Sequence, residues 1–272
     1  MTAARAYAKI NLALLVGPPR PDGLHEVSTV LQRIDLYDDV ELEPAEVVTV
    51  EGFREDTLVR RALEALAVVC GADRAWRVRI EKRIPVAAGL GGGSSDAATA
   101  LRLAHALLDS PLSRQELDAL AASVGSDVPF FLRPGTQLAT GSGTDLVSVE
   151  APLDYTVLVA LPNREAKEST AAVYRAFDAR SGAEAFESRV TALQAALSRI
   201  RTPVDLAELP ANDLAGSRLA GELVALGAFR ADVSGAGPAV YGLYERRADA
   251  EHAAGSLRGA ARTWIAEPVE GP

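Results

Sequence analysis

A glycine-rich segment between a short strand pattern and an Ala/Leu-rich helix pattern constrains this chain most strongly. The segment is Pro85-Val-Ala-Ala-Gly-Leu-Gly-Gly-Gly-Ser-Ser-Asp-Ala-Ala98. Glycines allow the backbone to adopt positive φ and to approach a ligand closely. The start of the following helix directs free N–H groups and the positive end of the helix dipole to the same place. The order strand, glycines, helix therefore predicts an anion site suited to a di- or triphosphate.

Three other interpretations of this segment are weaker. A Walker A loop needs Gly-Lys-Ser/Thr, and no lysine follows these glycines. The dinucleotide fingerprint G-x-G-x-x-G fails at its third glycine, where Ser94 stands. A plain turn with a serine N-cap would not need so many glycines followed by two hydroxyls. We expect Ser94 and Ser95 to donate to phosphate or to coordinate Mg²⁺, and Asp96 to be either a favourable N-terminal helix charge or an outer partner of Mg²⁺.

Composition sets the broad class. The chain has 272 residues, 48% of them hydrophobic, which suffices for one large or two medium domains. A net charge of −9 argues against a nucleic-acid backbone as the main partner. Cys70 is the only cysteine, so an internal disulfide is impossible and a reducing compartment fits. We find no signal peptide and no apolar run long enough for a bilayer, and we expect a cytoplasmic protein without a membrane partner.

The pattern along the chain predicts an α+β fold with two lobes. Residues 4–16 alternate as a strand, with Ile10, Leu12 and Leu14 on one face and Lys9, Asn11 and Ala13 on the other. Residues 26–43 resemble a hairpin with a turn near 37–39, and residues 130–149 are typical of strand and turn. Further strands are predicted at 77–82 and 152–161, and helices at 57–69, 94–108, 113–124, 184–200, 217–226 and 249–257. The helix at 113–124 is opened by a Ser113/Glu116 capping box and ended by Gly125. We expect an N-terminal domain over 1–152 and a C-terminal domain over 153–272.

Two further features are ambiguous from the residues alone. Lys9 lies in an apolar strand of a chain that has only three lysines among its 28 basic residues. Because lysine is a compact point charge and arginine a planar fork, lysine at this position indicates a role near a reacting oxygen. A second glycine element, Val233-Ser-Gly-Ala-Gly-Pro-Ala-Val240, could be a simple hairpin turn.

Three segments, in this order, resemble the galactokinase, homoserine kinase, mevalonate kinase and phosphomevalonate kinase superfamily. They are the strand AYAKINLAL, the loop PVAAGLGGGSSDAA and the late turn VSGAGPAVY. Finer details resemble its branch in the non-mevalonate isoprenoid pathway: the long GLGGGSSD loop, DGLHE at 22–26, GSDVPFF at 125–131 and NDL at 212–214. The resemblance implies a two-lobed kinase with its active site in the interdomain cleft. It also implies ATP-dependent phosphorylation of the 2-hydroxyl of 4-diphosphocytidyl-2-C-methyl-D-erythritol.

The same resemblance implies roles for individual residues. Asp127 would be the general base and also contact substrate, and Lys9 would keep it ionised and stabilise charge on the reacting oxygens. From the residues alone, a helix-capping aspartate is the favoured interpretation of Asp127. The triphosphate would bind Pro85 and the loop residues Gly89, Leu90, Gly91, Gly92, Gly93, Ser94 and Ser95. Adenine would lie near Thr57. Mg²⁺ should arrive with ATP, with Ser95 as its predicted protein contact.

The cytidyl end is where the sequence departs from the family pattern. Asn11 would orient substrate and His25 would hydrogen-bond the cytosine edge, but Leu24 stands where the family commonly has an aromatic residue. Thr170 and Tyr174 are the matches for the family's later substrate residues, with Tyr174 as a stacking face. The main alternative is another small-alcohol kinase of the superfamily, and a non-catalytic nucleotide-binding protein is a second. We expect a small-molecule substrate, no nucleic acid, and a monomer or homodimer.

Overall fold

The computed structural model describes residues 1–53, 57–70, 74–163 and 169–271. The first half of the chain forms β1 (Thr2–Pro19), β2 (His25–Ala45), β3 (Thr49–Glu51), α1 (Thr57–Val69), β4 (Ala75–Glu81), α2 (Gly92–His105), α3 (Arg114–Val124), α4 (Val128–Phe131), β5 (Thr136–Gly141) and β6 (Asp145–Val149). The second half forms β7 (Thr156–Pro162), α5 (Thr170–Ala179), α6 (Phe186–Leu197), the 3₁₀ helix η1 (Pro203–Glu208), α7 (Arg218–Ala225), β8 (Arg230–Val233), β9 (Val240–Tyr244), α8 (Arg247–Ser256) and β10 (Ala261–Ala266). This mixture confirms the predicted α+β class.

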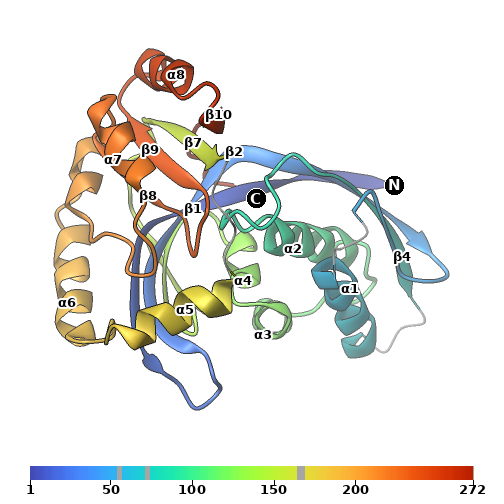
Figure 1. Cartoon of the computed structure of the whole chain (residues 1–272). Helices are drawn as coiled ribbons and strands as arrows, with labels where there is room; N and C mark the ends of the chain where they lie inside the picture. Colours follow the sequence, from blue (N-terminus) through green and yellow to red (C-terminus); the bar gives the residue numbers. More distant parts are fainter. Residues whose placement is uncertain (54–56, 71–73, 164–168, 272) are drawn as a thin grey trace.

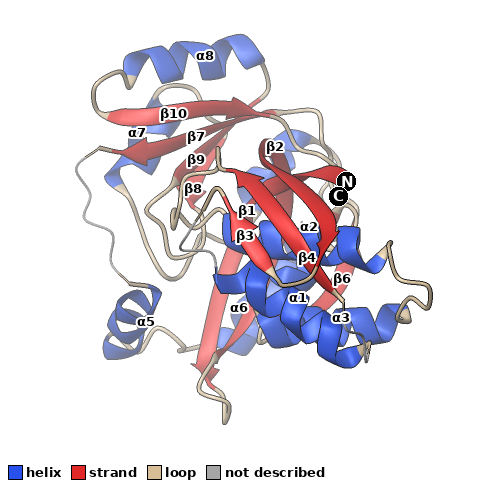
Figure 2. Cartoon of the chain, turned by 90° about the vertical axis from the view of Figure 1, so that its right-hand side faces the viewer, coloured by secondary structure: helices blue, strands red, loops and turns tan. Residues whose placement is uncertain are grey.

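The strands form two sheets. The first half contributes a six-stranded sheet with the order β3-β4-β2-β5-β6, in which β1 also pairs with β2. The second half contributes a four-stranded sheet with the order β10-β7-β9-β8. In Figure 1 the long β1–β2 pair runs across the molecule, with α1 to α4 on one side of it. Figure 2 shows α7 and α8 against the four-stranded sheet.

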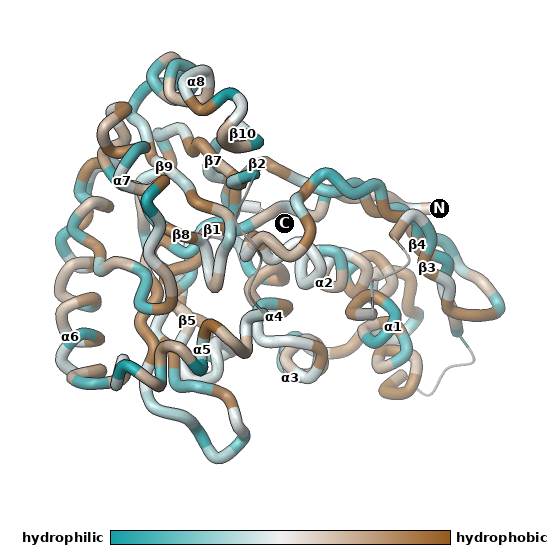
Figure 3. Tube along the Cα trace, viewed as in Figure 1, coloured by the Kyte–Doolittle hydropathy of each residue, from teal (hydrophilic) through white to brown (hydrophobic). Residues whose placement is uncertain are grey.

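Hydrophobic contacts join the two sheets. Ile10 and Leu12 of β1 share one buried cluster with Val157 of β7 and Tyr241 of β9. The outer helix α6 packs into the same cluster, and Figure 3 shows hydrophobic and hydrophilic residues alternating around it, as expected for a helix with one buried face. The sheets change between β6 and β7, so the predicted division of the chain at 152/153 falls in this connection.

The predicted hairpin over 26–43 was wrong. Residues 25–45 form one strand, β2, and its hairpin partner is β1. The turn was inferred from polar residues at 37–39, but Asp38 is fully buried and accepts hydrogen bonds from the backbone N–H groups of Arg83 (2.5 Å) and Ile84 (2.8 Å). In the sequence alone, a buried aspartate whose hydrogen-bond donors lie far along the chain looks the same as a polar turn residue.

The predicted alternation of β1 was correct only as far as Leu12. The pairing of β1 with β2 shifts register between Asn11 and Ala13, which is a β-bulge. A bulge exchanges the two faces of a strand. Ala13 therefore joins the cluster of Ile10 and Leu12, whereas Leu14 lies on the opposite side with Val173 and Phe177.

Helix predictions were mostly close, with three differences. Helix α2 begins at Gly92 rather than Ser94, and α4 occupies Val128–Phe131, where strand and turn were expected. Pro129 is compatible with α4 because the first turn of a helix does not need its N–H. Helix α5 and strand β10 were not predicted. Within the described residues, no helix is long and apolar enough to cross a membrane.

Candidate active site

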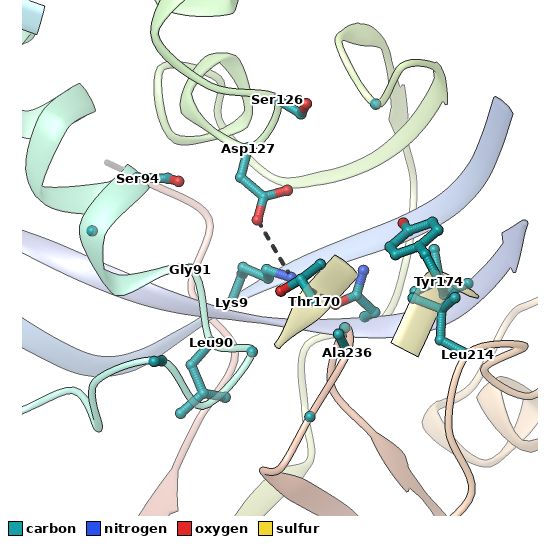
Figure 4. Close-up of a pocket in the computed structure, with 18 of the residues that line it drawn as sticks. Lys9, Leu90, Gly91, Ser94, Ser126, Asp127, Thr170, Tyr174, Leu214 and Ala236 are labelled. Atoms are coloured by element: carbon teal, nitrogen blue, oxygen red, sulfur yellow. Dashed lines mark hydrogen bonds and ion pairs between the residues drawn. The ribbon is translucent and has the colours of Figure 1, made fainter. Parts of the chain in front are cut away.

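A cavity of about 1050 Å³ lies where the two halves of the chain meet. Its lining comes from β1, the glycine-rich loop, the corner before α4, the start of α5 and the turn between β8 and β9 (Figure 4). Ligand pockets typically have volumes of about 300–1000 Å³, so this cavity is at the upper end of that range. Most of the predicted site residues line it: Lys9, Asn11, Leu24, His25, Pro85, Gly89, Leu90, Gly91, Gly92, Gly93, Ser94, Asp127, Thr170 and Tyr174.

The glycine-rich loop presents a helix start to this cavity. Gly91 is the N-cap of α2 and has φ 70°, a conformation that favours glycine. The Ser95 N–H donates to the Gly91 carbonyl at 2.9 Å, which is the first bond of the helix. The amides of residues 92–94 precede that bond and belong to the N-terminal turn, where helices bind anions.

The loop is fixed from two sides. The Lys9 backbone N–H donates to the Leu90 carbonyl at 2.9 Å, and the Ser234 hydroxyl donates to the Gly89 carbonyl at 2.9 Å. Gly89 has φ 86°, and a Cβ there would stand 2.1 Å from the Ser234 carbonyl oxygen. Only glycine fits at this contact. The second glycine element is therefore part of the site and not an isolated turn.

Lys9 and Asp127 meet in the cavity. The Lys9 Nζ lies 3.6 Å from Asp127 Oδ2 (Figure 4). It also donates to Asn11 Oδ1 at 2.7 Å. Lys9 is only 4% exposed, whereas the Asp127 side chain is 39% exposed. Asn11 is held in turn by donating to the Thr29 hydroxyl at 2.8 Å. The ammonium is thus fixed and the carboxylate reaches the open part of the cavity.

The capping interpretation of Asp127 does not fit the structure. Asp127 occupies the N-cap position of α4, but within the described residues its side chain caps no helix N–H. Its backbone is in the helical region (φ −81°, ψ −13°) rather than the extended region usual for a capping residue. The carboxylate is available for another role.

The part of the cavity that contains His25 and Tyr174 is built from β2 and α5. His25 Nε2 lies 2.8 Å from Asp178 Oδ1, and the His25 ring packs against Tyr174 with ring centroids 4.8 Å apart. Burial, and secondarily the charge of Asp127, raises the pKa of Tyr174 to about 12. Leu24 is 47% exposed, and Thr170 begins α5 at the rim.

Sequence reasoning missed Lys82, which also lines the cavity. Its Nζ donates to Asp38 Oδ2 at 2.5 Å and to Asp96 Oδ2 at 2.7 Å. Burial alone would lower the pKa of Lys82, but the two carboxylates outweigh it and raise that pKa. Asp96 is fully buried, pairs with Lys82 and lies beyond the first turn of α2. Its two expected roles, a favourable helix charge and an outer partner of Mg²⁺, stay predictions. The scarcity of lysine in the sequence was the signal that could have identified Lys82.

Two predicted contacts are not placed in the cavity by the structure. Ser95 is only 1% exposed, whereas its neighbour Ser94 lines the cavity. Thr57 begins α1, but its side chain lies outside the described residues. Both contacts stay predictions. In the described part of the chain, no group of three or more His, Cys, Asp or Glu residues is arranged to hold a metal ion.

Comparison with known proteins identifies the family. The model "GHMP kinases N terminal domain" matches residues 57–135, and "GHMP kinases C terminal" matches residues 217–262. A 4-diphosphocytidyl-2-C-methyl-D-erythritol kinase of Chlorobium phaeobacteroides (strain BS1) is 35% identical over 94% of this chain and 93% of its own length. The enzyme of that name from Salinispora arenicola (strain CNS-205) is 40% identical over 93% of this chain and 86% of its own.

Solved structures agree. A crystal structure of 4-(cytidine 5'-diphospho)-2C-methyl-D-erythritol kinase superposes with a TM-score of 0.77 at 32% identity, covering 99% of this chain and 100% of the other. A mevalonate kinase superposes with a TM-score of 0.74 at 13% identity over 99% and 100% of the two chains, which shows the shared fold. The sequence identity over nearly the whole length places this chain in the 4-diphosphocytidyl-2-C-methyl-D-erythritol kinase family of the GHMP kinases.

Proposed function

We propose that this protein transfers the γ-phosphoryl group of ATP to the 2-hydroxyl of 4-diphosphocytidyl-2-C-methyl-D-erythritol, with Lys9 and Asp127 as its catalytic pair. The observation that carries the residue assignment is the approach of Lys9 Nζ to Asp127 Oδ2, 3.6 Å, in a cavity that the glycine-rich helix start also lines. Family membership supports the substrate, because the relatives are kinases of this compound by name.

Phosphoryl transfer needs alignment, charge neutralisation and a base for the attacking hydroxyl, and little covalent chemistry from the protein. Asp127 Oδ2 accepts the proton of the substrate hydroxyl as the oxygen attacks. Lys9 stabilises negative charge on the attacking oxygen and the γ-phosphate. Because Asn11 fixes the ammonium at 2.7 Å, this positive charge is in place before the substrate binds.

The triphosphate binds at the N-terminal turn of α2, beside Pro85 and the glycines of the loop. Mg²⁺ bound together with ATP would neutralise charge on the phosphate oxygens. A magnesium ion typically takes only one or two protein oxygens when phosphates supply others, so the lack of an acidic cluster among the described residues is compatible with it. The Ser94 hydroxyl lines the cavity and suits such a contact, and Ser95 is the second candidate.

The cytidyl group binds in the part of the cavity that contains His25 and Tyr174. His25 contacts the base edge, Tyr174 offers a stacking surface, and Leu24 gives apolar contact where relatives commonly have an aromatic ring. Asn11 and Thr170 orient the remainder of the substrate. We also propose that the two lobes divide near residue 152, in the connection between β6 and β7, and that the protein is cytoplasmic, in keeping with its single cysteine.

A coupled assay of ADP production tests the assignment. Purified protein with ATP and Mg²⁺ is offered the cytidyl substrate, mevalonate, homoserine and galactose in separate reactions. We expect turnover that depends on the cytidyl compound. Turnover with mevalonate or homoserine, and none with the cytidyl compound, would instead make this a kinase of another small alcohol.

A further inference from the structure

We propose that Asp178 is a positioning residue that fixes the tautomer of His25 and thereby makes the site select cytosine over uracil. This inference rests on the proposed function, because it concerns how the nucleotide substrate of that reaction is recognised. It goes further in naming a residue of α5 that does not itself need to touch the base.

The geometry around His25 is built by one face of α5. His25 begins β2, and its side chain is only 10% exposed. Its ring packs against Tyr174 at 4.8 Å and meets Phe177 edge-on at 6.3 Å, and Asp178 Oδ1 lies 2.8 Å from Nε2. Residues three and four apart lie side by side on a helix, so Tyr174, Phe177 and Asp178 form one surface against the imidazole. The ring therefore has one defined orientation.

The carboxylate determines which ring nitrogen carries the proton. A neutral imidazole has one N–H donor and one acceptor nitrogen, and an ionised carboxylate can only accept. In the neutral ring, the Nε2–Asp178 contact thus places the proton on Nε2 and leaves Nδ1 as an acceptor. Within the described residues, His25 Nδ1 has no hydrogen-bond partner, and His25 lines the cavity together with Asp178. An acceptor nitrogen is therefore the group that remains for a ligand.

This acceptor distinguishes the two pyrimidines. Cytosine carries an amino group that donates at the position where uracil carries a carbonyl oxygen that accepts. An acceptor Nδ1 can accept a hydrogen bond from the cytosine amino group. Opposite uracil it faces a carbonyl oxygen, and because both atoms are acceptors no hydrogen bond forms. Buried polar groups left unpaired in this way reject a wrong ligand more strongly than an apolar slot does. Without Asp178, the Nδ1–H tautomer becomes accessible and can donate to the uracil oxygen.

The competing explanation is that Asp178 forms an ordinary surface ion pair. Its side chain is 47% exposed, and exposed pairs contribute little to stability. A purely structural pair predicts the same loss for cytidine and uridine ligands. The tautomer role predicts a change in their ratio and a change in the protonation pattern of one imidazole.

The test compares Asp178→Ala, Asp178→Asn and the control Asp249→Ala, which removes an exposed, ion-paired aspartate of α8. Nitrogen-15 NMR of histidine-labelled protein reports the protonation of each ring nitrogen of His25, with His105 and His252 as internal references. Steady-state kinetics then give kcat and KM for the cytidyl substrate and its uridyl analogue. For Asp178→Ala we expect the Nε2–H tautomer to lose its dominance, the preference for cytosine to fall by about tenfold to a hundredfold through KM, and kcat to stay near wild type. Asp178→Asn keeps an acceptor oxygen and should restore much of the preference.

Two results would overturn the inference. One is an unchanged ratio of kcat/KM for the two substrates in Asp178→Ala, and the other is a wild-type His25 with its proton on Nδ1. Both presuppose that the wild-type protein phosphorylates the cytidyl substrate. Absence of that activity in the wild type would instead contradict the proposed function, so the two failures are distinguishable.

Discussion

Replacing Asp127 with asparagine separates catalysis from architecture at this site. Asparagine has nearly the same shape as aspartate but cannot accept the proton of the substrate hydroxyl. A positioned general base contributes about 10²–10⁴-fold to a rate, which corresponds to about 3–5 kcal/mol of barrier. We therefore expect kcat of Asp127→Asn to fall by that factor, with ATP affinity nearly unchanged.

The structure also predicts what this substitution costs in stability. At 3.6 Å the Lys9–Asp127 attraction is about 4–5 kcal/mol in an effective dielectric of about 20, before solvent is considered. Because the Asp127 side chain is 39% exposed, water screens most of it, and about 1 kcal/mol or less should remain. Lys9 keeps its bond to Asn11. For a chain of this size, such a loss lowers Tm by at most about 2–4 °C.

The assay combines three measurements on Asp127→Asn. Kinetics with the cytidyl substrate give kcat, calorimetric titration gives the affinity for ATP, and thermal unfolding gives Tm. Asp39→Asn is the matched control, since Asp39 of β2 is 40% exposed and paired with Arg83 at 2.7 Å. Near-wild-type turnover of Asp127→Asn would refute the base assignment. Lost turnover accompanied by a stability loss larger than that of the control would indicate a structural role instead.

Three other perturbations address the nucleotide, the base and the metal. Gly92→Val should weaken ATP binding, because a Cβ at this position would stand 3.1 Å from Ile84 Cγ2 and displace the start of the helix. Gly221→Val on α7 is the control, since its Cβ would meet open space and ATP affinity should not change. Equal ATP affinity in the two folded variants would mean that the phosphate site lies elsewhere. Tyr174→Ala should raise KM for the cytidyl substrate by the equivalent of about 1–3 kcal/mol, and Leu24→Tyr should leave it equal or lower; the opposite pattern would show that another residue packs the base. Chelation of Mg²⁺ should abolish turnover and excess Mg²⁺ restore it, and activity that persists in chelator would exclude the metal requirement.

Local chemistry explains what could be predicted from the sequence. The Ser113/Glu116 capping box opens α3 as expected, because its hydrogen bonds join residues only three apart. The glycine-rich loop and its helix were also predictable, since positive φ and a free helix start are properties of adjacent residues. The predicted site residues came from motif resemblance, and the structure brings most of them into one cavity.

Contacts between distant segments explain what was missed. Asp38 was taken for a turn residue because its partners are 44 to 46 residues away. The bulge in β1 depends on its pairing with β2, so Leu14 was assigned to the wrong face. Strand β10 gains its partner from β7, about a hundred residues earlier in the chain. For the same reason Asp178 was not predicted as a site residue, and the sequence offers only the scarcity of lysine as a signal for Lys82, whose carboxylate partners are brought near by the fold.

The arrangement of β1 indicates that the floor of the cavity is preorganised. Over three residues, the Lys9 N–H holds the glycine-rich loop, the Lys9 side chain reaches Asp127, and the Asn11 carbonyl accepts the Tyr241 hydroxyl at 2.9 Å. One strand therefore joins the phosphate loop and the second sheet by hydrogen bonds, and the proposed base by an ion pair. Charge stabilisation costs least when the donors are already oriented before the reaction. Since the backbone of Lys9 carries the architectural bond and its side chain the charge, substitution of this side chain changes the chemistry while the loop keeps its anchor.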